Sequence, residues 1–198
     1  MAANPFDPGY YGSAELRQFG FARVGEGCAV ARNATVVGLS NITLGDRVRI
    51  DGYTTLVATS GIIRLGSFVH LCSSVVIGGR GGVEIEDYAS LSHGVRLLSA
   101  VDDFSGDWMT NSTLPDRVLG VQAAPIRVGR YVPIGSGCLI LPGAVMEEGA
   151  AVRALSVVSG TLPAWTISGG DPARPLRERS RRLLDRLARM DDDGGAEA

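Results

Sequence analysis

Aliphatic residues recur along this chain at a fixed step of six residues. The positions form six triplets: Val24, Val30, Val36; Leu44, Ile50, Leu56; Leu65, Leu71, Ile77; Ile85, Leu91, Leu97; Val128, Ile134, Ile140; and Met146, Val152, Val158. Insertions that lengthen the six-residue spacing occur only between triplets, which places them at one corner of a three-sided coil. A fixed period predicts a solenoid whose coils stack on their neighbours. Sandwich strands would instead alternate with period two at variable spacing.

A second repeat supports the three-sided coil. The residue four positions after each of these aliphatics is no larger than valine, with the single exception of Leu162. Small side chains suit the tight corners where two walls meet. Gly, Asp and Asn lie between, as at Gly45 and Asp46, and these residues tolerate a left-handed backbone. The predicted fold is therefore all-β, a parallel β-helix of about six coils.

The repeat also divides the chain into segments. Residues 1–23 form an arm that ends in one short helix, Ser13–Phe19, with Ser13 as its cap. Residues 24–174 form the β-helix. After the fourth coil a long excursion, residues 102–125, interrupts the repeat. Loops of this length in compact domains are usually functional or disordered, and its aromatic and acidic residues favour function.

The C-terminal segment has helical periodicity. Leu176, Leu183, Leu187 and Met190 share one face of a helix predicted over residues 175–190, and arginines cover the other face. Such a helix binds membranes or nucleic acid in some proteins. A cap on the open end of the solenoid is the favoured interpretation, because repeat folds require terminal caps. Residues 191–198 are an acidic tail that we expect to be disordered.

Composition narrows the class of function. The net charge is −2, so no long-range field indicates nucleic acid or an anionic membrane. All basic residues are arginine, which excludes lysine-based covalent chemistry. Cys28, Cys72 and Cys138 cannot pair completely and lack metal-like spacing, so reduced thiols are expected. No signal peptide or membrane-spanning stretch is present. We therefore expect a cytoplasmic protein without stable membrane insertion.

Several motifs resemble those of the hexapeptide-repeat acyltransferases. The most specific are Ile134–Gly137, Leu141–Ala144, Ala154–Val158 and Ser168–Arg174. The segment Ser99–Gly106, with a Thr-Asn pair soon after it, looks like a branch found in polysaccharide and O-antigen gene clusters. The resemblance implies a left-handed β-helix and a homotrimer with sites at the subunit clefts. It also implies an acetyl-CoA-dependent acetyltransferase that acts on a sugar hydroxyl, either of a saccharide or of a nucleotide-linked sugar.

Acyl transfer needs a base, and histidine is the usual one. The chain has only two. His70 precedes the interior Leu71, so it should point outward, and the resemblance makes it the expected base; a surface or interface histidine is the alternative. His93 falls at a corner beside Gly94, where a structural role is favoured, and is the second candidate.

Asp102 and Asp103 open the excursion. In better-known sugar acetyltransferases of this fold the catalytic histidine lies at the corresponding place, and Asp102 falls on it. The resemblance therefore implies that an aspartate orients His70, grips the acceptor or serves as the base, which would need burial or a like-charged neighbour. An Asp-rich turn is the alternative. Trp108 and Asn111, further along the excursion, are candidate contacts for the sugar.

The resemblance implies that the groove for acetyl-CoA, the acyl carrier, runs along the last two coils. The residues that it implies for binding acetyl-CoA are Gly135, Ser136, Ala154, Ser156, Pro172 and Arg174. Arg153 stands where the family usually has glycine, and it is either a second phosphate contact or a solvent-facing residue. Arg174 suits a phosphate by charge. No metal is expected.

Three other functions compete with O-acetylation. An N-acetyltransferase acting on an amino-deoxysugar nucleotide is the first alternative, since the sequence does not separate the two. A γ-class carbonic anhydrase has the same solenoid fold, but its metal needs three histidine ligands per site. This chain has two histidines, which disfavours that function. A scaffold without catalysis would not need the acidic, aromatic excursion.

Overall fold

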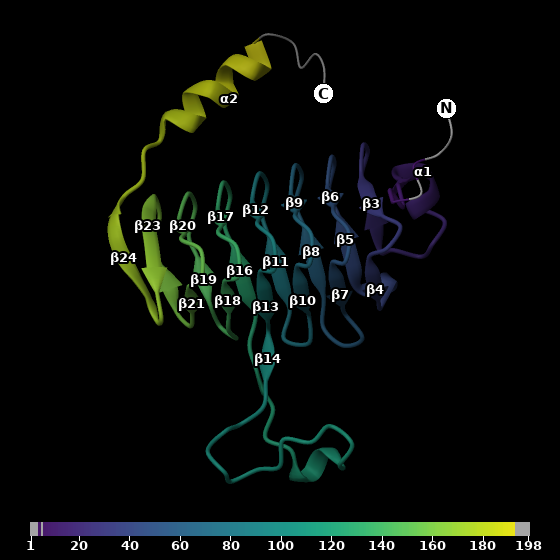
Figure 1. Cartoon of the computed structure of the whole chain (residues 1–198), viewed down its shortest axis with the longest axis vertical. Helices are drawn as coiled ribbons and strands as arrows, with labels where there is room; N and C mark the ends of the chain where they lie inside the picture. Colours follow the sequence, from purple (N-terminus) through teal and green to yellow (C-terminus); the bar gives the residue numbers. More distant parts are fainter. Residues whose placement is uncertain (1–3, 5, 193–198) are drawn as a thin grey trace.

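The computed structural model describes residue 4 and residues 6–192, so most of the expected tail, residues 193–198, lies outside the described part. Three sheets of parallel strands run the length of the molecule, and the chain passes from one to the next at each corner (Figure 1). The result is a stack of three-sided coils. Six coils are complete, as predicted, and a seventh has two walls.

Each coil contributes one strand to each wall. The strands of the first three coils are β2 (Arg23–Val24), β3 (Ala29–Ala31), β4 (Thr35–Val37), β5 (Ile42–Leu44), β6 (Arg49–Ile50), β7 (Thr55–Val57), β8 (Ile63–Leu65), β9 (His70–Leu71) and β10 (Val76–Gly78). Those of the later coils are β11 (Val83–Ile85), β12 (Ser90–Leu91), β13 (Arg96–Leu98), β16 (Ile126–Val128), β17 (Pro133–Ile134), β18 (Leu139–Ile140), β19 (Val145–Met146), β20 (Ala151–Val152), β21 (Val157–Val158), β22 (Thr161–Leu162) and β23 (Thr166–Gly170). A short 3₁₀ turn, η1 (Leu39–Asn41), lies at the first corner insertion.

The six-residue repeat lines the interior. Each of its eighteen positions lies on a strand, and all but Val36 are buried. Val36 is partly buried and packs against the same core. Successive coils pair in register, so that Ile50 lies beside Leu71 and Leu71 beside Leu91. One column of aliphatic side chains therefore supports each wall.

Aromatic residues occupy left-handed positions at one set of corners. Phe68, Tyr88, Tyr131 and Trp165 all have φ between 52° and 62°. Their rings form a ladder with centroid separations of 4.8, 5.4 and 6.3 Å. Left-handed backbone costs energy for residues with a Cβ atom, and stacking from coil to coil offsets that cost. The sequence pattern indicated Gly, Asp and Asn at corners and did not single out these aromatic positions.

The N-terminal arm differs from the prediction. The arm contains strand β1 (Tyr10–Gly12), which pairs antiparallel with β3 and which the sequence pattern did not predict. Helix α1 covers only Ser13–Leu16, and Gly12 is its cap. The Ser13 hydroxyl instead accepts a hydrogen bond from the backbone N–H of Cys28 at 2.8 Å. Ser13 thus ties the arm to the first coil and is not the helix cap.

The C-terminal helix begins later than the predicted residue 175. Strand β24 (Ala173–Glu178) pairs antiparallel with β23 and covers the edge of the nine-stranded sheet. Helix α2 (Arg182–Asp192) follows and extends away from the last coil (Figure 1). Between them the Arg179 guanidinium donates to the carbonyls of Tyr131 and Gly149 at 2.7 and 3.0 Å. The edge strand, and not the helix, therefore covers the end of this sheet.

The excursion leaves the solenoid as a ribbon. Strands β14 (Ala100–Val101) and β15 (Gln122–Ala123) pair at its base, and the short helix η2 (Asp116–Val118) lies near its tip. Figure 1 shows this segment projecting from the side of the coil stack. Within the described residues no helix has the length and apolar character needed to cross a bilayer.

We expect Leu97→Ala to lower the free energy of unfolding by about 2–5 kcal/mol, because it opens a cavity where the side chain is fully buried. The exposed neighbour on the same strand provides a matched control, and Arg96→Ala should change this free energy by less than about 0.5 kcal/mol. Urea titrations of both variants measure the difference. Equal losses would contradict the assignment of inward and outward positions.

Candidate active site

One wall of the solenoid carries a row of outward residues at equivalent positions. Asp51, Cys72, Ser92, Gly135 and Arg153 each follow an interior residue of the nine-stranded sheet. Their backbone N–H groups donate to a carbonyl of the next coil at 2.8–2.9 Å. Since hydrogen-bonded strands lie about 4.8 Å apart, successive members are roughly 5 Å apart along the wall. We call this row the site column.

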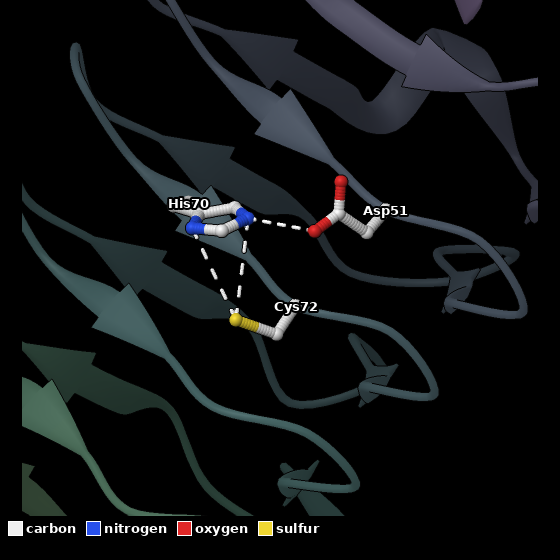
Figure 2. A group of neighbouring side chains, drawn as sticks. All are labelled: Asp51, His70 and Cys72. Atoms are coloured by element: carbon white, nitrogen blue, oxygen red, sulfur yellow. Dashed lines mark hydrogen bonds and ion pairs between the residues drawn. The ribbon is translucent and has the colours of Figure 1, made fainter. Parts of the chain in front are cut away.

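His70 points outward, as predicted, and lies beside the first two members of the column (Figure 2). Its Nε2 is 2.8 Å from Oδ2 of Asp51, and its side chain is 41% exposed. The Sγ atom of Cys72 is 3.9 Å from Nδ1 and 4.0 Å from Nε2. Asp51, and neither Asp102 nor Asp103, is therefore the carboxylate that bonds His70.

Asp51 is held by three partners. Its Oδ1 accepts from Arg49 Nε and from the Tyr10 hydroxyl, both at 2.8 Å, while Oδ2 faces His70. Burial raises the pKa of Asp51, but hydrogen bonds from Arg49, His70 and Tyr10 outweigh burial and lower the pKa to about 2. Asp51 is thus a fixed carboxylate that stays ionised at neutral pH.

Cys72 is a protonated thiol beside His70. Burial raises the pKa of its thiol, and the Asp51 charge raises it further. Oxygen, nitrogen and sulfur atoms of Asp51, His70 and Cys72 lie within 4.8 Å of one another, a group that sequence spacing did not predict. A cation there would meet the guanidinium of Arg49 on the same carboxylate and a thiol that resists deprotonation. The arrangement favours proton transfer over metal binding.

The other predicted catalytic residues lie elsewhere. His93 is an exposed corner residue that follows Ser92, and its carbonyl accepts from the N–H of Gly137 at 3.0 Å. Asp103 bonds Ser105 and Gln122 and so holds the base of the excursion. Asp102 is half-buried and lines a cavity of about 360 Å³. Strand β13 separates Asp102 from the site column within one chain.

The predicted sugar contacts both lie in the excursion. Trp108 is 50% exposed, and its ring rests against Gly120. The Asn111 side chain accepts from the N–H and hydroxyl of Thr113 at 3.0 and 2.8 Å, so it stabilises a local turn. Trp108 therefore presents a free aromatic surface, while Asn111 has a structural role in this conformation.

The predicted carrier residues divide into two sets. Gly135, Ser136, Arg153 and Ala154 lie on or beside the C-terminal half of the site column, and Leu155 at the same corner is 80% exposed. The backbone of coil six lies so close to Gly135 that a Cβ there would be 2.4 Å from the Ala154 nitrogen. Exposed backbone and an exposed leucine suit an extended, partly apolar arm such as pantetheine.

The second set consists of Ser156, Pro172 and Arg174, which are not members of the site column. Ser156 is buried, and its hydroxyl donates to the Arg153 carbonyl and accepts from the Gly170 N–H, so it supports the corner from inside. Pro172 and Arg174 are exposed at the turn and strand after β23. They remain candidates for the nucleotide end of the carrier.

Sequence reasoning missed Asp51, Cys72 and Ser92. The repeat contained a signal for them, since all three occupy the position directly after an interior aliphatic, as Gly135 and Arg153 do. A residue one step beyond the lattice points outward on the same wall. Reading the lattice by columns, coil by coil, would have grouped these five residues.

Comparisons with known proteins identify the relatives of this chain. No protein-family model matches the chain. The chain is 36% identical over 89% of its length to the dTDP-4-amino-4,6-dideoxy-D-glucose acyltransferase of Escherichia coli, of which it covers 92%. The structure of AntD, an N-acyltransferase from Bacillus cereus in complex with dTDP and 3-hydroxybutyryl-CoA, superposes with a TM-score of 0.88 at 30% identity, covering 96% of this chain and all of that one.

The fold is also shared more widely. A maltose O-acetyltransferase from Clostridium difficile matches with a TM-score of 0.52 at 21% identity, covering 85% of this chain and 74% of that chain, which shows a common fold alone. The fold is a left-handed β-helix, and the similarity to named acyltransferases over nearly the whole chain defines the class as acyltransferase. The chain belongs to the hexapeptide-repeat sugar acyltransferases and is an enzyme of that family.

The Asp51 network predicts a dependence of stability on acid pH. The pKa of Asp51 lies below its ordinary value of 3.8, so the stabilisation is complete above that value and is lost as pH falls through about 2. Asp51→Asn should therefore be less stable than wild type above pH 4, and the difference should shrink toward pH 2. Denaturant unfolding at several pH values measures it. A difference that stays constant between pH 4 and pH 2 would contradict the lowered pKa.

Proposed function

We propose that this enzyme transfers an acyl group from acyl-CoA to the amino group of a nucleotide-linked amino-deoxysugar. The observation that carries the proposal is the match, over nearly the whole chain, to an acyltransferase named for dTDP-4-amino-4,6-dideoxy-D-glucose. AntD supports it independently, because it is an N-acyltransferase whose complexes hold that nucleotide sugar and coenzyme A. The amine is thus favoured over the hydroxyl acceptor.

A sequence detail links the AntD complexes to the site column. AntD was altered at a serine and at an aspartate ten positions further on, and those structures hold dTDP or the aminosugar nucleotide. In the present chain Ser92 and Asp102 are the only serine and aspartate with that spacing. Ser92 is the middle member of the site column. We assign Ser92 and Asp102 to the acceptor site.

The column suggests where each substrate lies. The carrier arm occupies the C-terminal half, along Gly135, Arg153 and the exposed Leu155. The sugar lies over coils two to four, near Asp51, His70 and Ser92. The two substrates then meet at Ser92, which is one coil from Gly135 on one side and one coil from Cys72 on the other.

The chemistry requires few groups. The neutral amine attacks the thioester carbonyl, the C–S bond breaks, and the amine proton passes through a base to the departing thiolate of CoA. His70 is the base in this proposal, and backbone N–H groups at the corner stabilise the oxyanion. An amine binds already neutral, so it needs the base less than a hydroxyl does.

We further propose a homotrimer with shared sites. Asp102 and Ser92 lie at different corners of one coil, with the wall that contains β13 between them. A closed ring of three copies would bring the excursion of one subunit to the site column of the next. The exposed Trp108 and Phe104 of the excursion would then be covered. The three free cysteines suit a cytoplasmic location.

An acyl-transfer assay tests the proposed function. With acetyl-CoA or 3-hydroxybutyryl-CoA, we expect stoichiometric release of free CoA thiol when dTDP-4-amino-4,6-dideoxyglucose is present. The matched control is the same nucleotide sugar with a hydroxyl in place of the amine. Thiol release only with the hydroxyl sugar would replace N-transfer by O-transfer. Release with neither, from folded protein, would overturn the proposal.

Mixing two inactive variants tests the shared site. Ser92→Ala and Asp102→Asn should each lower kcat, because each removes a group at the acceptor. If one subunit supplies Ser92 and its neighbour supplies Asp102, random co-assembly restores about a quarter of the sites. Co-expression followed by the thiol assay measures the recovery. No recovery in confirmed mixed oligomers would place both residues of a site on one subunit.

A further inference from the structure

We propose that Asp51 is the positioning residue of the acyl transfer, and that it makes Nδ1 of His70 the atom that accepts the substrate proton. This inference rests on the proposed function, since it names the partner of the proposed base. It concerns a residue that no sequence motif singled out. Hydrogen bonds already occupy both oxygens of Asp51 and one nitrogen of His70.

One carboxylate oxygen of Asp51 accepts hydrogen bonds from Arg49 and Tyr10, and the other contacts His70. Oδ1 is shared between Arg49 and Tyr10, and Arg49 Nη2 also donates to the Tyr10 hydroxyl at 2.9 Å. This triangle fixes the plane of the carboxylate. Oδ2 then points at the imidazole at 2.8 Å, and the Asp51 side chain is only 16% exposed. A shielded, immobilised carboxylate is suited to holding a ring in one orientation.

The charge of Asp51 determines the tautomer of His70. A carboxylate with a pKa near 2 is ionised and can only accept hydrogen bonds. Nε2 of His70 must therefore carry the proton of the 2.8 Å contact. In the neutral ring the lone pair is then on Nδ1.

Nδ1 has no contact with Asp51. Figure 2 shows Nδ1 on the edge of the ring opposite to Asp51, with Cys72 below both nitrogens. Cys72 Sγ is 3.9 Å from Nδ1, and the protonated thiol does not compete as a base. Cys72 is also the column neighbour of Ser92. Nδ1 is thus the unprotonated nitrogen of the neutral ring, and the ring lies beside the column neighbour of Ser92.

A double-mutant cycle separates positioning from an independent role. We expect His70→Ala and Asp51→Ala each to lower kcat by about 10- to 100-fold with KM little changed, because general-base catalysis of this kind contributes that much or more. The double variant should be no slower than His70→Ala alone, since Asp51 acts through His70. Asp46→Ala is the control, because Asp46 lies in the same coil and its carboxylate only accepts a backbone N–H.

The cycle has three outcomes that would overturn the inference. One is an Asp51 effect of equal size in the wild-type and His70→Ala backgrounds. Another is an unchanged kcat in Asp51→Ala. The third is an unchanged kcat in His70→Ala while the wild type still transfers acyl groups, which would leave the proposed function standing without this base.

Imidazole NMR gives a readout that needs no activity. The chain has only two histidines, so ¹⁵N-labelled side chains give a simple spectrum, and His93→Gln assigns it. We expect a protonated Nε2 whose proton exchanges slowly in wild type and rapidly in Asp51→Ala. A proton on Nδ1, or no change on removing Asp51, would refute the arrangement. If the wild type transfers no acyl group, the proposed function fails and this spectrum still decides the role of Asp51.

Discussion

The hydrogen bonds between successive coils are the constraint on which the rest of this protein depends. In the inner coils each strand pairs in parallel with its equivalents one coil before and one coil after, in an unshifted register. Side chains at the same position of successive coils therefore form columns, and neighbours within a column are about 4.8 Å apart. Inward columns become the core and outward columns become a surface of evenly spaced groups. The core and the candidate site thus come from neighbouring positions of the same repeat, one pointing inward and the next pointing outward.

This constraint explains why a rigid site forms on a flat wall. Asp51, His70 and Cys72 are on two adjacent coils, and their backbones are fixed by the core beneath them. Arg49 and Tyr10 then immobilise the carboxylate from the outer side. Tyr10 comes from β1, which exists because the N-terminal arm pairs with β3. The arm thus contributes to the site through a single hydroxyl group.

The outcome of the sequence reasoning varied with the range of the interactions involved. The interior lattice and the outward His70 were predicted correctly, because strand alternation is a local property. The helix start at residue 175 was wrong, since pairing with β23 outweighs helical periodicity at the sheet edge. The aromatic corners were missed because their stability comes from rings in neighbouring coils.

The sequence by itself determined the scaffold of this enzyme and its family. A six-residue repeat gives every residue a defined position in its coil. Counting along the sequence therefore shows which residues point inward, which point outward and which lie at a corner. Only the tertiary structure decided which outward residues act together. Asp51 and His70 are nineteen residues apart, and their contact depends on the length of a full coil, on side-chain direction and on the partners that hold the carboxylate. These features arise only in the folded wall, because the contacts involved join residues on adjacent coils.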